Sequence, residues 1–422
     1  MSEEQILLVS TREVGEDERR AYIKEVEMRS LLETLGLKVV YHISFTIKEV
    51  NKTSFFGKGQ IEEITNLAKA TDATEVVIDS FLSPKQEMKI EEALSLPVSD
   101  REAVILAIFL LNAHSKEAKL QIKRAEAIYQ KPRLIFREAN YSQQRGGVRG
   151  AKGEGEKQIE LERRTIEKDI QKLEREIESI KKNRLTQHKK RERNKLYSFA
   201  LAGYTNAGKT TILNTLAPSA PKPEDKLFAT LDTTTRLVTL PSGKEITLSD
   251  TVGFIRDLPP LLIEAFSSTI EEALSADGII IVADASHPDS IECFKSTIDT
   301  LTRLNALDRI KLVVINKIDS SYDDISLSFL RSSGYKTIET NMKEKEKARE
   351  TILKALEEIV SENYTTLTLT LSYSSPLFSR LSQEKKIKSV EYKDDCILVV
   401  AEVPKDEEGR YAPYHWKASI YF

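Results

Sequence analysis

Short apolar runs alternate with amphipathic segments over the first quarter of the chain. Three β-rich runs lie there, at residues 6–10, 39–45 and 75–79. Two stretches between them, at 21–35 and 60–69, have helical spacing of their apolar positions. The alternation predicts a small N-terminal α/β domain with a mostly parallel sheet, which we place at residues 1–111.

The pattern changes at about residue 112 to one rich in Lys, Arg, Glu and Gln. Apolar residues then repeat at steps of three and four, as in the seam of a coiled coil; they are Ile159, Ile166, Ile170, Leu173, Ile177 and Ile180, with Arg163 interrupting the grid. Residues 113–130 also have a helical pattern. We therefore expect a helical hairpin over 112–196, whose connection at 141–158 contains five of the sixteen glycines together with Arg145 and Arg149.

Beyond residue 196 strands and helices alternate again. Six β-rich runs are predicted, at 197–202, 237–240, 244–249, 278–284, 311–316 and 336–340. This pattern is typical of a doubly wound α/β domain, here 197–361. The remaining residues, 362–422, predict a small α+β domain with strands at 367–371, 397–403 and 419–422 and a helix at 377–385. The fold class is thus multidomain α/β.

Composition narrows the setting. The 422 residues carry 63 Lys and Arg against 66 Asp and Glu, a net charge of −3, which excludes a uniformly basic coat but not a local basic patch. The two cysteines, Cys293 and Cys396, indicate a reducing compartment. The start of the chain lacks a signal-peptide pattern, and the longest apolar run, 103–111, is too short to span a membrane. We expect a monomeric, cytoplasmic protein.

A basic cluster follows the predicted seam. Residues 181–195 hold eight Lys or Arg and one Glu, and together with the arginines of the glycine-rich connection they could bind nucleic-acid phosphates. The alternative is a solvated helix face, and the sequence leaves both open. A second nucleotide site in residues 1–111 also stays open, although the only phosphate-loop-like feature there is the short turn at Gly57–Gly59.

The main chemical signal is a phosphate-binding loop. Eight residues match G-x-x-x-x-G-K-[ST] between a predicted strand and a predicted helix: Gly203, Tyr204, Thr205, Asn206, Ala207, Gly208, Lys209 and Thr210. Glycines let several backbone N–H groups point at phosphates, and the helix N-terminus favours negative charge. We expect Lys209 to reach the β- and γ-phosphates and Thr210 to ligate Mg²⁺.

Two later motifs complete a nucleotide site. The first, Asp250-Thr251-Val252-Gly253, offers a carboxylate for Mg²⁺ through a water and a glycine N–H for the γ-phosphate. The second is Asn316-Lys317-Ile318-Asp319. The Asp319 carboxylate can accept from both N1–H and N2–H of guanine, whereas adenine lacks that donor pair, so this spacing favours GTP over ATP.

The motifs together resemble those of the translation-factor-related GTPases and, more narrowly, the HflX family. The segments that carry this resemblance are 57–64, 144–147, 153–156, 203–210, 228–236, 250–266 and 284–289. It implies a ribosome-associated cytoplasmic GTPase that binds the large subunit and ribosomal RNA and that splits or rescues stalled or idle ribosomes under stress. It also implies that Thr230 completes the Mg²⁺ coordination and that its neighbours contact the nucleotide; these are Phe228, Ala229, Leu231 and Asp232. From the residues alone, Thr233, Thr234 and Thr235 remain alternatives to Thr230.

The sequence departs from the family pattern where a Ser-Ala pair usually supports guanine O6. Glu339, Thr340 and Asn341 occupy that place, so we expect backbone N–H groups of Thr340 and Asn341 to take over. Phe254 follows Gly253, where a Ras-like protein has a water-orienting glutamine. An apolar side chain cannot polarise water, so hydrolysis should be slow without a partner, roughly 10⁻⁴–10⁻³ s⁻¹.

Further hypotheses stay open at this stage. Asn206 is found in relatives of the TrmE group that hold K⁺ beside the phosphates, the alternative being that it only braces the loop. Other functions to weigh are a GTP-gated ribosome-assembly factor, an RNA-modification GTPase of the TrmE type, which neither cysteine supports, and an ATP-driven remodeller, against which Asp319 argues.

Overall fold

The structure is a computed structural model of the 422-residue chain. It describes residues 4–144, 152–191, 196–217, 234–251, 253–256, 259, 261–262, 276–320, 323–384 and 386–415. The chain divides into two compact units, one formed by 1–238 with 246–345 and the other by 239–245 with 346–422. Each unit is described by itself. None of the helices within the described ranges combines the length and apolarity that a membrane crossing requires.

The N-terminal part of the first unit is a four-stranded parallel sheet in the order β2-β1-β3-β4. Its strands are β1 (Gln5–Glu13), β2 (Lys38–Ile47), β3 (Glu75–Asp79) and β4 (Val98–Asp100). Its helices are α1 (Glu18–Thr34), α2 (Lys58–Ala70), α3 (Pro84–Leu94) and α4 (Arg101–Asn112). The parallel α/β arrangement expected for this region is confirmed.

Strand β1 alternates its buried side chains between two cores, one on each face of the sheet. Ile6 and Leu8 pack with α1, α4 and the start of the next helix, whereas Leu7 and Val9 pack with α2 and α3. A parallel sheet covered on both faces needs such apolar runs. The Gly57 turn caps α2, with Gln60 Oε1 accepting from the Gly57 N–H at 2.9 Å.

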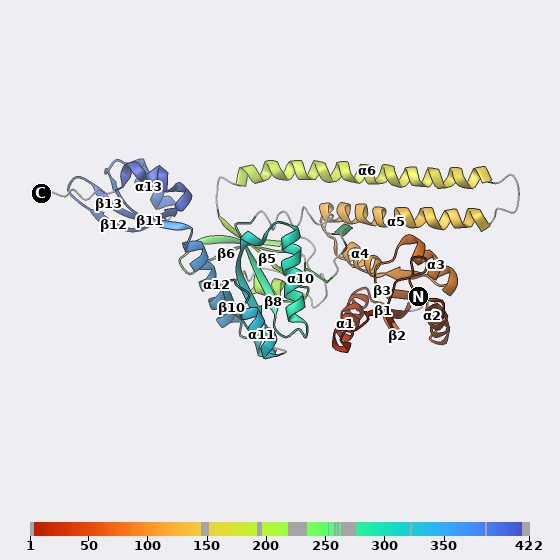
Figure 1. The fold of residues 1–422 in the computed structure, drawn as a ribbon. Coiled ribbons are helices and arrows are strands. Elements are labelled where there is room, and N and C mark those ends of the chain that lie inside the picture. Colours follow the sequence, from red (N-terminus) through yellow and green to blue (C-terminus); the bar gives the residue numbers. More distant parts are fainter. Residues whose placement is uncertain are drawn as a thin grey trace. The chain divides into compact units, whose positions relative to one another are not determined.

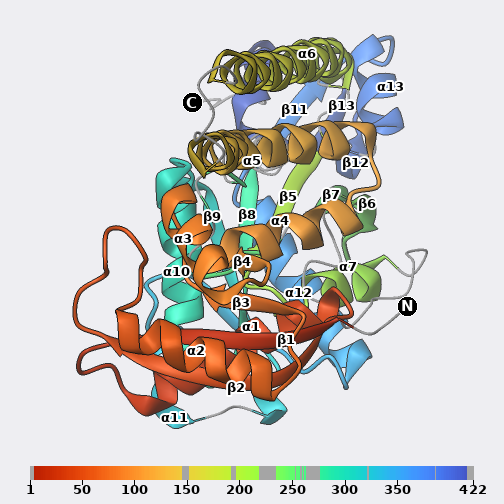
Figure 2. The same cartoon turned by 90° about the vertical axis from the view of Figure 1, so that its right-hand side faces the viewer.

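Two long antiparallel-connected helices follow, α5 (Lys116–Gln144) and α6 (Lys152–Arg191), and they lie side by side in both views (Figures 1 and 2). Lys131 and Glu167 join them at 2.8 Å, and the described seam side chains from Ile166 to Ile180 are half-buried. The hairpin expectation is confirmed. The glycine-rich connection was predicted too long, because helix extends through Gln144 and restarts at Lys152.

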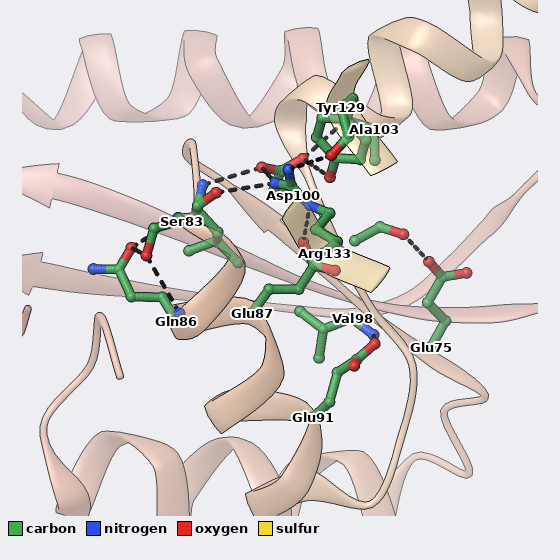
Figure 3. Close-up of polar contacts among 12 residues, drawn as sticks. Glu75, Ser83, Gln86, Glu87, Glu91, Val98, Asp100, Ala103, Tyr129 and Arg133 are labelled. Carbon is green, nitrogen blue, oxygen red and sulfur yellow. Dashed lines mark hydrogen bonds and ion pairs between the residues drawn. The ribbon is translucent and has the colours of Figure 1, made fainter. Parts of the chain in front are cut away.

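Helix α5 is fastened to the N-terminal sheet by a buried polar cluster (Figure 3). The Asp100 carboxylate accepts from Tyr129 Oη at 2.8 Å and from Arg133 Nη2 at 3.1 Å, and it also caps α4 by accepting from the Ala103 N–H at 2.9 Å. Arg133 Nε donates to Glu87 Oε2 at 2.6 Å, and its guanidinium lies 3.4 Å from the Tyr129 ring centroid. We call Glu87, Asp100, Tyr129 and Arg133 the Arg133 cluster.

The rest of the first unit contains a six-stranded sheet in the order β10-β9-β8-β5-β7-β6. Its strands are β5 (Tyr197–Gly203), β6 (Thr234–Thr239), β7 (Glu245–Asp250), β8 (Gly278–Asp284), β9 (Ile310–Asn316) and β10 (Thr337–Glu339). The helices described with it are α7 (Lys209–Leu216), α10 (Ser290–Arg303) and α11 (Asp324–Arg331). Strands β7, β5, β8, β9 and β10 pair in parallel, so the ends of β5, β7 and β9 lie along one edge of the sheet.

The second unit begins with α12 (Lys345–Ser361), from Glu346 on, and contains an antiparallel sheet in the order β11-β13-β12. Its strands are β11 (Tyr364–Leu371), β12 (Ile387–Tyr392) and β13 (Ile397–Pro404), and α13 (Pro376–Gln383) packs on them. Strand β12 was not predicted, because its alternation of Ser, Glu and Lys with Ile and Val is weak. The strand predicted at 419–422 lies outside the described residues.

Candidate nucleotide-binding site

The loop at 203–210 connects the end of β5 to the start of α7 and curls where its glycines require it. Gly203 has a φ of 152° and Gly208 a φ of 97°. A β-carbon on Gly203 would lie 2.3 Å from the Val282 carbonyl oxygen, and one on Gly208 would lie 2.4 Å from Asn316 Nδ2. Both positions therefore admit only glycine, and they bring the loop against the ends of β8 and β9.

Lys209 is the first residue of α7, and its side chain is buried in the loop. Its Nζ donates to the Tyr204 carbonyl oxygen at 2.8 Å and to the Gly203 carbonyl oxygen at 3.0 Å. Burial lowers its pKa to about 8, because the charged amine loses water and Asp250 offsets this only in part. A buried ammonium held by carbonyl oxygens alone favours an anionic ligand beside it.

Thr210 and Asp250 come from opposite sides of the site and meet there. The Thr210 hydroxyl donates to Asp250 Oδ2 at 2.6 Å, and the carboxylate lies at the buried end of β7. A hydroxyl and a carboxylate oxygen side by side are the hard donors that Mg²⁺ prefers. The residues present therefore fit a magnesium ion.

The segment after Asp250 returns to the loop. The Phe254 N–H donates to the Gly203 carbonyl at 3.0 Å, and the Thr205 N–H donates to the Phe254 carbonyl at 2.8 Å. A β-carbon on Gly253 would lie 3.1 Å from Lys209 Nζ, so this glycine is packed against the amine. The Phe254 side chain is buried in the apolar core beside β8 and β9, where it cannot orient a water molecule.

The residues after β9 brace the loop from a third side. Asn316 Nδ2 donates to the Ala207 carbonyl at 2.9 Å. Lys317 Nζ donates to the Asn206 carbonyl at 3.0 Å and forms an ion pair with Asp284 Oδ2 at 2.7 Å. Asn206 itself is exposed and has a φ of 60°, a conformation that asparagine tolerates well.

Asp319 lies beyond this brace, with Ile318 beside it in a short 3₁₀ turn. Its Oδ2 contacts Lys343 Nζ at 2.5 Å, and the hydrogen bond from Lys343 lowers its pKa. The neighbouring loop is ordered by Asn341, whose Oδ1 accepts the Lys343 N–H at 2.9 Å, and by buried Thr340, whose hydroxyl approaches Asn316 Oδ1 at 3.4 Å. A guanine base would have to displace Lys343 from the Asp319 carboxylate.

The structure thus brings three of the predicted motifs to one sheet edge. Thr251, with its hydroxyl bonded to the Leu201 carbonyl at 2.7 Å, supports β7 and lies away from the loop atoms. The residues predicted from the family resemblance at Phe228, Ala229, Thr230, Leu231 and Asp232, their alternatives Thr233–Thr235, and Val252 lie outside the described residues or at their margin. Sequence reasoning assigned no role to Lys343, although its place two residues after Asn341 was a usable signal.

A phosphate-binding loop with a buried lysine, a hydroxyl–carboxylate pair and an Asn-Lys-x-Asp brace on one parallel sheet defines a P-loop GTPase. Family models agree in three consecutive regions: a GTP-binding GTPase N-terminal model over residues 23–110, a GTP-binding GTPase middle region over 112–191 and a 50S ribosome-binding GTPase over 198–317.

Curated relatives fix the family. A GTPase HflX of Lacrimispora saccharolytica is 37% identical over 96% of this chain and 94% of its own, and a GTPase HflX of Chlamydia pneumoniae is 36% identical over 92% and 83%. This chain belongs to the HflX family of GTPases and hydrolyses GTP. A solved GTP-binding protein of Sulfolobus solfataricus in complex with GDP aligns with 84% of this chain and 99% of its own, at 24% identity and a TM-score of 0.45.

Proposed function

We propose that this GTPase acts in the cytoplasm as a monomer that binds the large ribosomal subunit and ribosomal RNA and splits or rescues stalled or idle ribosomes under stress. The observation that carries the proposal is the match of residues 198–317, which include the whole described nucleotide site, to the 50S ribosome-binding GTPase model. A GTP-gated assembly or RNA-modification factor would share this site, so the experiment below is chosen to separate a splitting activity from binding alone.

The helical hairpin supports an RNA partner. Helix α6 has 40 residues, which at 1.5 Å per residue extend about 60 Å, and its end coincides with the basic run at 181–195. A long arm with a basic end can reach phosphates far from the nucleotide site and gain affinity by counterion release.

At the nucleotide site, the proposal assigns roles residue by residue. The N–H groups of 203–210 and the Lys209 amine would hold the phosphates, and Gly253 would contact the γ-phosphate. Thr210, Thr230 and, through water, Asp250 would hold Mg²⁺, which supplies charge stabilisation to the phosphates when bound. Asp319 would select guanine, with Thr340 and Asn341 supporting the base.

Buried Phe254 supports partner-stimulated hydrolysis, because this side chain offers no polar group to the attacking water. A K⁺ ion near Asn206 is part of the proposal as an additional activator. Comparing single-turnover GTP hydrolysis in K⁺ and in Na⁺ tests it, and equal rates would remove the ion from the scheme.

The central experiment combines light scattering of 70S ribosomes with sucrose-gradient sedimentation. Purified protein is added with GTP, GDP or a non-hydrolysable GTP analogue at several salt concentrations. We expect scattering to fall and free subunits to accumulate only with the triphosphates, and binding to weaken steeply with salt.

An Asp319→Asn variant serves as the matched control, because an amide can donate to the extra carbonyl of xanthine. It should respond to xanthosine triphosphate and ignore GTP, which excludes contaminating GTPases. Binding without subunit release would favour the assembly-factor function, and nucleotide-independent binding would overturn the proposal.

A further inference from the structure

The start of the phosphate loop and the segment after Gly253 are joined to the N-terminal domain through one buried carboxylate. The Tyr204 hydroxyl donates to Glu27 of α1 and accepts the Arg256 N–H at 2.9 Å. Tyr204 is 7% exposed and the Glu27 side chain 9%, so this group of contacts is shielded from water. All of these residues belong to the same compact unit.

Arg101, the first residue of α4, strengthens the junction. Its Nη2 donates to Glu27 and, at 3.2 Å, to the Arg256 carbonyl, and its Nη1 donates to Asp79 Oδ1 at 2.7 Å. Burial alone would raise the pKa of Glu27, but Arg101 and Arg256 outweigh that effect and lower it. Glu27 is therefore an ionised acceptor, and hydrogen bonds to charged groups are stronger than those between neutral ones.

The position that this junction fixes is unfavourable for a γ-phosphate. Residues 254–256 are hydrogen-bonded to the loop residues Gly203, Tyr204 and Thr205, so the Thr205 N–H is already used by the Phe254 carbonyl. Gly253 is packed on the Lys209 amine that has to reach the γ-phosphate. Binding a triphosphate requires this segment to move away from the loop, whereas a diphosphate lacks the group that would collide with it.

We propose that Glu27 is a positioning residue that, through the Tyr204 hydroxyl, holds residues 253–256 on the phosphate loop and biases the site toward GDP over GTP. The N-terminal domain thereby restrains the GTPase domain, and any movement that separates Glu27 from Tyr204 relieves the restraint. The inference depends on GTP binding and not on the ribosomal role.

The test measures equilibrium binding of fluorescent GDP and of a fluorescent non-hydrolysable GTP analogue to the full chain without ribosomes. Tyr204→Phe removes only the bridging hydroxyl, and Glu27→Gln keeps an acceptor but removes its charge. We expect each variant to bind the analogue more tightly relative to GDP, with the affinity ratio changing about tenfold. The double variant should change it no further, because both substitutions break one contact chain.

The controls lie on the same helix. Tyr22→Phe and Glu33→Gln make the same chemical changes at exposed positions of α1 and should leave the ratio unchanged. A role in stability alone would lower the melting temperature or weaken both nucleotides equally, so an unchanged ratio in a folded Tyr204→Phe protein overturns the proposal. If Glu27→Gln fails to fold, the Tyr204→Phe result decides.

Discussion

The nucleotide site and the Arg133 cluster both bury a cation, but they treat it differently. Arg133 faces the carboxylates of Glu87 and Asp100, which together with Tyr129 outweigh the effect of burial and raise its pKa. Lys209 is held by two carbonyl oxygens, and burial lowers its pKa to about 8. A buried charge matched by internal opposite charges stabilises the fold, whereas one matched only by partial charges is prepared for a ligand.

The sharpest test of this contrast is Lys209→Ala. Loss of the amine removes a donor to the transferring phosphoryl group, so we expect single-turnover GTP hydrolysis to fall by about 10³-fold. The melting temperature of the nucleotide-free protein should not decrease, because the removed charge is poorly solvated. Lys311→Ala, at an exposed position of β9, is the control and should leave the rate unchanged. A large loss of stability in Lys209→Ala would contradict the contrast.

Arg133→Met should show the reverse pattern. It leaves Glu87 and Asp100 buried without their cation, which is expected to lower the free energy of unfolding by about 3 kcal/mol. Urea denaturation measures this, with Lys89→Met on the surface of α3 as control, expected within about 0.5 kcal/mol of the parent. GDP affinity of the folded variant should be unchanged. A selective loss of nucleotide binding would instead assign the cluster to the site.

Asp319→Asn sharpens the picture of the site's outer edge. The amide cannot accept from both N1–H and N2–H of guanine, so GTP affinity should fall about 30-fold while affinity for xanthosine triphosphate rises. Competition binding against a fluorescent guanine nucleotide measures both effects. If GTP and ATP are discriminated equally well before and after the change, another residue selects the base.

The pKa of Lys209 predicts a pH dependence of GDP binding. Phosphates require the charged amine and raise its pKa in the complex, so binding takes up a proton once the pH exceeds about 8. Affinity should therefore be nearly constant below pH 8 and about tenfold weaker at pH 9 than at pH 7. Isothermal titration at several pH values measures this, and the residual binding of Lys209→Ala should show no such change above pH 8. A flat profile in the parent protein would mean that the free amine is not neutralised by burial.

Much of the molecule could be predicted from local pattern. The β-rich runs ending at Gly203, Asp250 and Asn316 were correctly placed, because buried parallel strands are continuous apolar segments. Their motifs predicted one sheet edge. Strand β4 and helix α3 were missed, since a three-residue strand and a helix beginning at Pro84 leave little periodicity to detect.

The contacts that tie distant segments together were not accessible in this way. Glu27 and Tyr204 are 177 residues apart, and neither belongs to a motif that names the other. Glu87, Asp100 and Arg133 likewise look like ordinary charged residues of amphipathic helices and turns. Only burial distinguishes them, and burial is a property of the packed chain.

The amino-acid order by itself determined the GTPase class and its phosphate loop, because the glycine spacing and the carboxylates at strand ends act through local backbone geometry. The tertiary structure alone decided which buried charges are neutralised within the protein and which are left for a nucleotide. The physical reason is that a charge's energy depends on the water it loses and the opposite charges it meets, and both are set by residues far away in the chain.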